Sequence, residues 1–358
     1  MIKGNSITPE IKQLLNDFLK LSVEDRNTFI NFIAAHSSPS SERTLIDTKF
    51  AEGMVCPHCG AKGKGVHRHG KTKGGKQRFY CSHCKRFFGV TTGSVMYHTK
   101  KDFQTWRNYI SCFLNGFTIR KCAYMVGINK NTAFLWRHKI CESLNNIMNE
   151  VKLGGIVEAD ETYFRVSYKG GEVLEDRKPR KRGSSMFHKD KKRGLSSEQV
   201  CVPTAVNRSG KSVAKIAEVG KGSLKGVEAV IGDHLEAGST LCADGAAWYG
   251  RIATKHGMKR VRVGAKESKK GKEGIQHVNA YHSGLKRFVD RFYGISTKHL
   301  NDYLMWFNFA QHAKEAYGEK VRILTNHIVT TNSYIRRVDI ARKPAIPYIC
   351  EGVRRIAG

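Results

Sequence analysis

The sequence lacks any long apolar run and is short of acidic side chains. It holds 31 Asp and Glu against 62 Lys and Arg, a formal net charge of +31 over 358 residues. No stretch reaches the ~20 consecutive apolar residues of a membrane span. No basic segment followed by an apolar one opens the chain, as a secretory signal would. We therefore expect a soluble, cytoplasmic protein.

The excess of positive charge lies after residue 50, because residues 1–50 hold six basic and six acidic side chains. A surplus of this size calls for a polyanionic partner. Nucleic acid fits best, since neutralised phosphates release counterions, and an anionic membrane is the rival. Two runs rich in Lys and Arg, 177–193 and 259–272, would ordinarily be solvated loops. Because both flank the acidic site described below, we expect them to order on DNA.

Four of the ten cysteines form two matched pairs, Cys56-Pro-His-Cys59 and Cys81-Ser-His-Cys84, separated by 21 residues. Structural zinc takes four tetrahedral ligands, and each CxxC turn supplies two thiolates. A redox pair is disfavoured, because no thioredoxin-like βαβ pattern surrounds either turn. The spacing predicts a zinc ribbon over residues 46–98, and its many basic side chains indicate a DNA contact.

Residues 99–150 predict a helix-turn-helix. Within 118–140, Gly127 provides a tight turn and Asn129 can cap the second helix. In this motif the second helix enters the major groove of DNA. Any two packed helices joined by glycine share the pattern, but the basic surroundings favour DNA binding. The outward-facing residues that contact DNA are expected to be Lys130, Asn131, Thr132 and Arg137.

Residues 151–318 alternate strand-like and helix-like stretches, which predicts an α/β core with a mixed sheet flanked by helices. One strand carries Glu158 and Asp160 on one face and Glu161 on the other. Acids within an apolar strand are costly unless they are paired or bound to a cation. A second strand ends at Asp244, which with Asp160 makes a candidate two-carboxylate Mg²⁺ site.

A third element follows in a predicted helix. Asn279 and Lys286 are seven residues apart, or two helical turns, and so share one face. An amide oxygen can complete the shell of a hard cation. A lysine two turns away can hold a DNA phosphate near the metal. The sequence thus groups Asn279 and Lys286 with the two aspartates.

Three motifs together resemble the insertion-sequence transposases of the ISXO type, the zinc-ribbon group of the DDE transposases. VEADETYF is similar to that family's first-acid strand, and LCADGAAWY to its second-acid strand and helix. HVNAYHSGLKRFVDRFYGISTKHLNDYLMWF is similar to its third block, in which one subgroup carries Asn in place of Glu. The resemblance covers roughly residues 50–310 and implies an RNase H-like core of DDE or DDNK type. It implies the catalytic residues Asp160, Asp244, Asn279 and Lys286, with the first three as Mg²⁺ ligands.

The activity implied by this resemblance is DNA transposition. Two Mg²⁺ or Mn²⁺ ions would support in-line cleavage at transposon ends and attack of the freed 3′-OH on target DNA. The implied partners are double-stranded DNA, as end repeats and target, and further copies of the chain, because two ends must be held together. The setting would be the bacterial cytoplasm, at the nucleoid when bound to DNA. A Ser or Tyr recombinase is disfavoured, because no Ser or Tyr stands in a recognisable recombinase context.

Asn279 removes a carboxylate from the general DDE pattern and leaves alternatives open. Glu273 and Asp290, six residues before it and eleven after, are fallback acids. A catalytically inactive, domesticated DNA-binding regulator would keep the ribbon and helix-turn-helix but would not cleave. A nuclease on the same core would cut structured nucleic acid without joining. An RNA-binding ribbon protein would leave the acidic motifs unexplained.

The remaining segments lie at the two ends of the chain. Residues 1–45 predict an N-terminal pair of amphipathic helices, with a Ser-rich linker over 36–45. Residues 319–358 are expected to form a C-terminal tail. The predicted organisation is therefore 1–45, 46–98, 99–150, 151–318 and 319–358.

Overall fold

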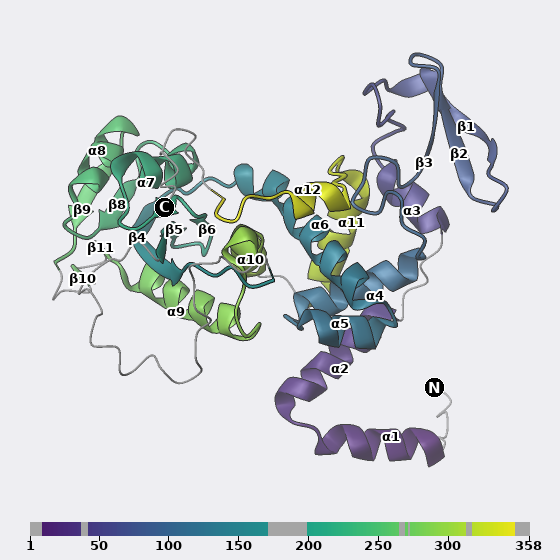
Figure 1. The fold of residues 1–358 in the computed structure, drawn as a ribbon, viewed down its shortest axis with the longest axis horizontal. Coiled ribbons are helices and arrows are strands. Elements are labelled where there is room, and N and C mark those ends of the chain that lie inside the picture. The colour runs from purple at the N-terminus through teal and green to yellow at the C-terminus, as the bar shows by residue number, and fades with distance from the viewer. Residues whose placement is uncertain are drawn as a thin grey trace, which may run out of the picture. The chain divides into compact units, whose positions relative to one another are not determined.

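The computed structural model describes residues 9–36, 42–170, 199–264, 269–270, 273–312 and 317–347 (Figure 1). Contacts between residues divide the chain into two compact units. Unit 1 comprises Met1–Arg137 and Glu315–Tyr334, and unit 2 comprises His138–Lys314 and Ile335–Gly358. The predicted division into five segments stays a prediction. The basic run 177–193 and part of the run 259–272 lie outside the described residues.

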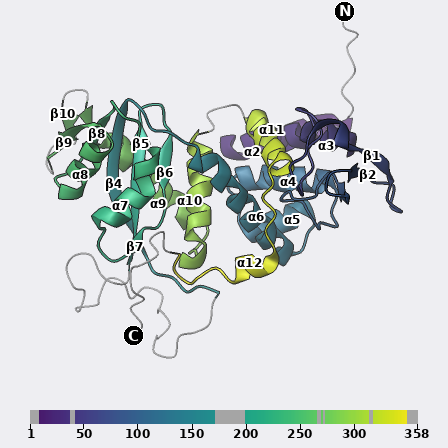
Figure 2. The ribbon, with the colours of Figure 1, turned by 90° about the horizontal axis from the view of Figure 1, so that it is seen from above.

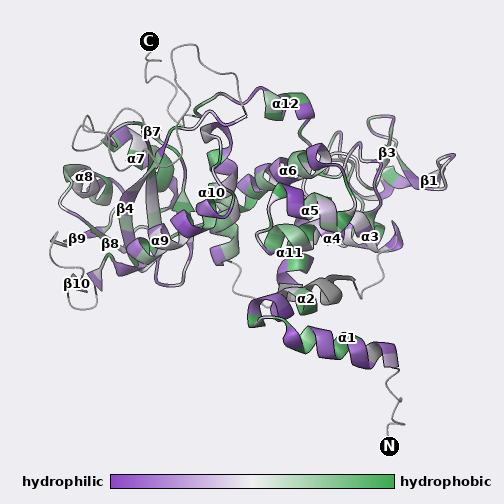
Figure 3. Ribbon diagram, turned by 60° about the horizontal axis from the view of Figure 1, so that its bottom comes forward, coloured by the Kyte–Doolittle hydropathy of each residue, from purple (hydrophilic) through white to green (hydrophobic). Residues whose placement is uncertain are grey.

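Unit 1 opens with three helices: α1 (Pro9–Lys20), α2 (Val23–His36) and α3 (Glu42–Lys49). The Ser22 hydroxyl accepts the N–H of Asp25 at 3.0 Å, so the predicted N-cap of the second helix is confirmed. Residues 42–45 are helical, so the predicted linker is wrong at these positions. The helix forms there because Leu45 and Ile46 are buried and hold α3 against the rest of the unit. Along α1, hydrophilic and hydrophobic residues alternate (Figure 3).

The ribbon follows as a three-stranded antiparallel sheet in the order β1-β2-β3. Its strands are β1 (Val66–Lys71), β2 (Gln77–Cys81) and β3 (Arg86–Gly89), preceded by the 3₁₀ turn η1 (Gly63–Gly65). Phe79 and Phe88 stand opposite each other on β2 and β3, and their rings stack with centroids 5.5 Å apart. Both are buried, so this pair is the core of the small sheet.

Unit 1 also contains the helices α4 (Phe103–Leu114), α5 (Ile119–Val126) and α11 (Tyr317–Thr330). The long helix α6 (Lys130–Asn149) begins in unit 1 and ends in unit 2. Asp102 and Thr118 cap α4 and α5 through their side-chain oxygens. The buried Trp106 and Trp136 stack with centroids 3.8 Å apart. α11 packs against α2, α3 and α4, which places a late part of the chain among its first helices.

Unit 2 is built on a six-stranded sheet. The strands are β4 (Ile156–Arg165), β5 (Gln199–Asn207), β6 (Ser212–Ala214), β7 (Glu218–Val219), β8 (Thr240–Ala243) and β9 (Lys259–Arg262). Their order is β6-β5-β4-β8-β9, with β7 pairing to β5. β5 is antiparallel to β4 and β6, whereas β4, β8 and β9 are parallel. This mixed order is that of an RNase H-like sheet, so the predicted fold class is confirmed.

Helices cover both faces of this sheet (Figures 1 and 2). They are α7 (Leu224–Ile231), which is followed by the 3₁₀ turn η3 (Gly232–His234), α8 (Ala247–Lys255), α9 (Gln276–Asp290) and α10 (Thr297–His312). The short helix α12 (Arg337–Ala341) also belongs to unit 2. α7 packs on β5 and β6, α8 on β8 and β9, and α9 on β4 and β5, while α10 contacts β6 and α9. A small hairpin, β10 (Lys269–Lys270) and β11 (Glu273–Gly274), precedes α9. No described helix is long and apolar enough to cross a membrane.

Candidate functional sites

The two predicted aspartates lie on neighbouring parallel strands. Ala159 of β4 pairs with Ala243 of β8, so Asp160 and Asp244 occupy the next position on each strand. Neighbouring strands lie ~4.8 Å apart, and side chains at one register position point to the same face. Asp244 follows the last residue of β8, and its Oδ1 accepts the N–H of Ala246 at 2.9 Å. The sheet thus sets the two carboxylates side by side.

The surroundings of Asp160 disfavour the negative charge of its carboxylate. Burial raises its pKa to about 6, and the negative charge of Asp244 adds to the rise. The N–H of Glu161 and the ammonium of Lys286 act in the opposite direction. Two carboxylates in a partly buried position repel each other unless a proton or a cation lies between them. The pair therefore has the charge and the placement of a divalent cation site.

Helix α9 forms the second wall of a cleft beside Asp160. The cleft has a volume of about 500 Å³ and is lined by Asp160, Glu161, Thr162, Tyr163, Asn279, His282, Ser283 and Lys286. Asn279 and Lys286 are exposed and lie two turns apart on one face of α9. Three of the four predicted catalytic residues thus line one cleft, and the strand register places Asp244 next to it.

Glu158 has a role that the sequence analysis missed. Its carboxylate is fully buried, with 0% exposure, and its Oε2 accepts the N–H groups of His277 at 2.6 Å and Val278 at 3.0 Å. The guanidinium of Arg208 lies 2.8 Å from Oε1. A carboxylate at a helix N-terminus satisfies free N–H groups and complements the helix dipole. Glu158 therefore ties the start of α9 to β4, two residues from Asp160.

Glu161 points to the opposite face of β4, as the strand alternation predicts. Its Oε1 accepts hydrogen bonds from the indole Nε1 of Trp248 at 3.1 Å and the hydroxyl of Tyr249 at 2.6 Å. Burial raises the pKa of Glu161, and the Tyr249 hydrogen bond lowers it. Both aromatic residues lie at the start of α8, just after Asp244, so these bonds hold that segment against β4.

His282 also escaped the sequence analysis. It lies three residues after Asn279 on α9, is only 8% exposed, and its Nδ1 is 3.8 Å from Oδ2 of Asp160. Burial lowers its pKa to about 4, with a further contribution from Lys286. The imidazole is therefore neutral at pH 7. Its Nε2 is buried and has no hydrogen-bond partner within the described part of the chain. The helical spacing from Asn279 was the available signal.

The two fallback acids lie outside the cleft lining. Glu273 is on β11, and its Oε1 is 3.9 Å from Nζ of Lys259. Asp290 is exposed at the last residue of α9. Asp290 shares the face of α9 that carries Asn279 but lies about three turns farther along the helix.

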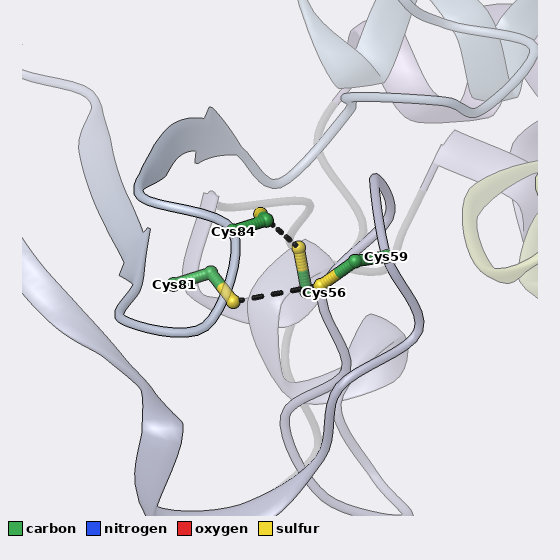
Figure 4. Close-up of side chains that lie close together, drawn as sticks. All are labelled: Cys56, Cys59, Cys81 and Cys84. Atoms are coloured by element: carbon green, nitrogen blue, oxygen red, sulfur yellow. Dashed lines mark hydrogen bonds between the residues drawn. The ribbon is translucent and has the colours of Figure 1, made fainter.

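The four predicted zinc ligands converge from two loops (Figure 4). The sulfur atoms lie within 4.8 Å of one another, with Sγ–Sγ distances of 3.6 Å for Cys56 and Cys84 and 3.7 Å for Cys59 and Cys81. A tetrahedral zinc ion with Zn–S bonds of ~2.3 Å separates its sulfur ligands by roughly 3.8 Å. The donor set and its spacing fit a structural zinc ion, which these four thiolates would hold.

The helix-turn-helix geometry agrees with the sequence at its turn. Gly127 ends α5 in the left-handed conformation, with φ of +66°. Oδ1 of Asn129 accepts the N–H of Asn131 at 2.8 Å, as expected of a residue that caps α6. Lys130 and Asn131 are exposed and Thr132 is half-buried.

Arg137 does not point outward, and this part of the prediction is wrong. The side chain is buried with 0% exposure. Its guanidinium donates a hydrogen bond to the backbone carbonyl of Phe117 and lies 3.6 Å from Sγ of Cys122. Unit 1 uses this arginine to satisfy a carbonyl between α4 and α5, so it contributes to the packing of the helices.

A second buried polar cluster lies within unit 2. Oδ2 of Asp302 is 2.5 Å from Nδ1 of His138 and 3.5 Å from Nδ1 of His299. Nζ of Lys343 is 2.7 Å from Oδ1 of Asp302 and 2.8 Å from Oε2 of Glu142. Burial lowers the pKa of His138 to about 4. The lysine already supplies the positive charge, so this cluster is an internal ion-pair network.

Comparison with known proteins identifies a family match over the part of the chain that forms the cleft. Residues 152–311 match the family model of the ISXO2-like transposase domain. A chain in a crystal structure of a pre-cleavage Mos1 transpososome is also similar, with 8% identity over 67% of this chain and 82% of that one. The TM-score of 0.20 is too low for that likeness to carry an argument. The family match contains every residue of the cleft, so residues 152–311 are similar to an ISXO2-like transposase domain, as the resemblance to the ISXO-type transposases predicted.

Proposed function

We propose that the protein is a metal-dependent DNA transposase that cuts transposon ends and joins the freed 3′-OH to target DNA. The observation that carries the proposal is the register of β4 and β8, which sets Asp160 beside Asp244 next to the cleft lined by Asn279 and Lys286. The transposase domain match supports the general activity. The metal dependence and the strand-transfer step rest on the chemistry of these side chains.

Each residue has a distinct part in this proposal. Asp160, Asp244 and the amide oxygen of Asn279 would hold Mg²⁺ or Mn²⁺, the hard cations that oxygen ligands favour. Such ions activate water or a 3′-OH and stabilise the leaving oxygen in an in-line displacement. Lys286 is exposed two turns from Asn279 and would bind a DNA phosphate. The neutral imidazole of His282 adds no charge beside Asp160.

The proposed DNA contacts outside the cleft lie in unit 1. The four cysteines would hold a structural Zn²⁺ and so fold the basic ribbon. Lys130 and Asn131, at the exposed start of α6, and Thr132 after them would contact double-stranded DNA. We further propose that copies of the chain assemble on DNA, because the reaction joins two transposon ends.

The test is a strand-transfer assay on a labelled transposon-end duplex with Mg²⁺ or Mn²⁺. Asp160→Ala and Asp244→Ala should each abolish the joined product. Asp290→Ala is the matched control, because this exposed acid on α9 lies outside the cleft lining, and it should keep activity. Joined products that persist in both cleft variants would overturn the assignment.

The second candidate is the DNA-binding regulator, which the neutral amide of Asn279 favours. A dead site would bind transposon ends tightly but leave them uncut in either metal. The nuclease alternative predicts cleavage that is independent of terminal repeats and yields no joined product. Asn279→Ala, compared with Asn279→Asp, would show whether this position contributes a ligand oxygen.

A further inference from the structure

One face of the ribbon sheet carries a row of rings open to solvent. His67 of β1 stands opposite Tyr80 of β2, which stands opposite Phe87 of β3. Ring centroids are 5.7 Å apart for His67 and Tyr80 and 4.8 Å apart for Tyr80 and Phe87. His69 extends the row, with its ring 5.1 Å from that of Phe87. We call these four residues the ring row.

The ring row is separate from the core of the ribbon. Phe79 and Phe88, on the other face of β2 and β3, are buried and stack on each other. Phe87 is 45% exposed, His67 and His69 are exposed, and Tyr80 is half-buried. Aromatic side chains gathered on an open surface are unusual in a soluble protein unless they meet a partner.

The charge around the ring row identifies the kind of partner. Residues 62–89 contain nine Lys and Arg and no Asp or Glu. The guanidinium of Arg78 lies 4.2 Å above the ring of Phe87. The turn between β1 and β2 is basic as well, with Lys73 and Lys76 exposed. A surface that joins open rings to many cations complements a polyanion that also offers flat apolar groups.

We propose that the ring row binds single-stranded DNA by stacking unpaired bases, while the surrounding cations hold its phosphates. Every base has a π-face, and stacking on protein aromatics with cationic support is how single strands are bound without a defined sequence. A duplex hides these faces between its base pairs. The setting rests on the proposed function, since strand cleavage creates DNA ends at which base pairs open, but the binding itself needs no cleavage.

The test measures binding of the zinc-loaded full-length protein to labelled DNA by fluorescence anisotropy, without Mg²⁺. Three ligands are compared: a short single strand, the same strand with abasic positions, and the corresponding duplex. The intact strand should bind on the order of tenfold more tightly than the abasic one. Phe87→Ala should weaken binding of the intact strand by a similar factor and leave duplex binding unchanged.

The control variants separate stacking from folding. Tyr293→Ala removes a tyrosine that is 87% exposed in unit 2 and should change nothing. Phe87→Trp should keep single-strand binding, and both Phe87 variants should keep the zinc content of the wild type. Equal binding of intact and abasic strands by the wild type would overturn the proposal, whatever the variants do. So would equal losses for single strand and duplex in Phe87→Ala. Strand transfer is measured separately, so its failure would not be confused with either result.

Discussion

The four-cysteine site and the carboxylate cleft differ in what a metal would contribute to each. The three short strands of the ribbon bury only Val66, Phe79, Cys81 and Phe88, so the thiolates close a fold with a small core. The cleft is formed by β4, in the middle of a six-stranded sheet, and by α9 beside it. We therefore expect the first site to need its cation in order to fold, and the second to be folded before a cation binds.

The largest effect is expected from removing the proposed zinc. A structural zinc ion contributes about 10–16 kcal/mol of apparent folding free energy in small zinc modules. Cys56→Ser, or a strong chelator, should release zinc and unfold the ribbon while the sheet of unit 2 stays protected. Zinc content and hydrogen exchange would measure this, with His58→Ala as the control, because His58 is exposed and outside the sulfur group. A ribbon that stays protected without zinc would remove the contrast between the two sites.

The next effect concerns the buried ion-pair network around Asp302 and Lys343. Asp302→Asn should destabilise unit 2 by about 3–5 kcal/mol, because it leaves the buried ammonium of Lys343 without its closest carboxylate. Denaturant unfolding would measure the change, and chelators should have no influence on it. The exposed pair of Glu319 and Arg322 is the control, since Glu319→Gln removes a solvent-screened surface ion pair and should leave the stability almost unchanged. Equal losses in both variants would contradict the buried ion pair.

A smaller effect is expected where β4 meets α9. Glu158→Gln removes the charge that accepts two N–H groups and pairs with Arg208, so stability should fall by about 1.5–3 kcal/mol. Because the start of α9 then loosens, strand transfer should also require a higher Mg²⁺ concentration for half-maximal rate. Glu273→Gln, at a surface pair, should shift neither quantity. An unchanged Mg²⁺ requirement would limit Glu158 to a purely stabilising role.

The smallest effect has the opposite sign. The pKa of Asp160 rises from 3.8 to about 6 on folding, so the folded protein binds the proton more tightly and loses stability as the pH rises through that window. Asp160→Asn should therefore stabilise the metal-free protein at pH 7 by about 1–2 kcal/mol while abolishing strand transfer. Urea unfolding at pH 4 and pH 7 would test this, because the gain should disappear at the lower pH. Mg²⁺ should stabilise the wild type more than the variant.

The sequence predicts best what is local along the chain. The cysteine ligands, the strand around Asp160 and the shared face of Asn279 and Lys286 all follow from spacing within a few residues. The pairing of Asp160 with Asp244 needed the further assumption that two strands are neighbours, which the sheet confirms. The fold class followed from the same alternation of strands and helices.

What escaped prediction depends on partners far away in sequence. The sequence position of Arg137 in the second helix predicts a DNA contact. In the structure its side chain is buried and donates a hydrogen bond to the backbone carbonyl of Phe117. Glu158 shares the strand face of Asp160, but its carboxylate accepts the N–H groups of His277 and Val278 at the start of α9. Residues 212–219 have the composition of a single strand, but they form β6 and β7, because only the two ends of this run pair with β5.

The position of α11 constrains how such a protein can be divided or recombined in evolution. Residues 315–334 belong to unit 1 although they follow the sheet of unit 2, so the chain passes between the two units three times. A fragment that stops at residue 311 would keep the whole matched transposase domain but strip α11 from α2, α3 and α4. Unit 1, which contains the ribbon, is built from two separate segments of the chain, so a single cut or fusion point cannot exchange it as a whole. The inheritance of unit 1 is therefore tied to that of the sheet of unit 2, because recombination at one point would not exchange either unit whole.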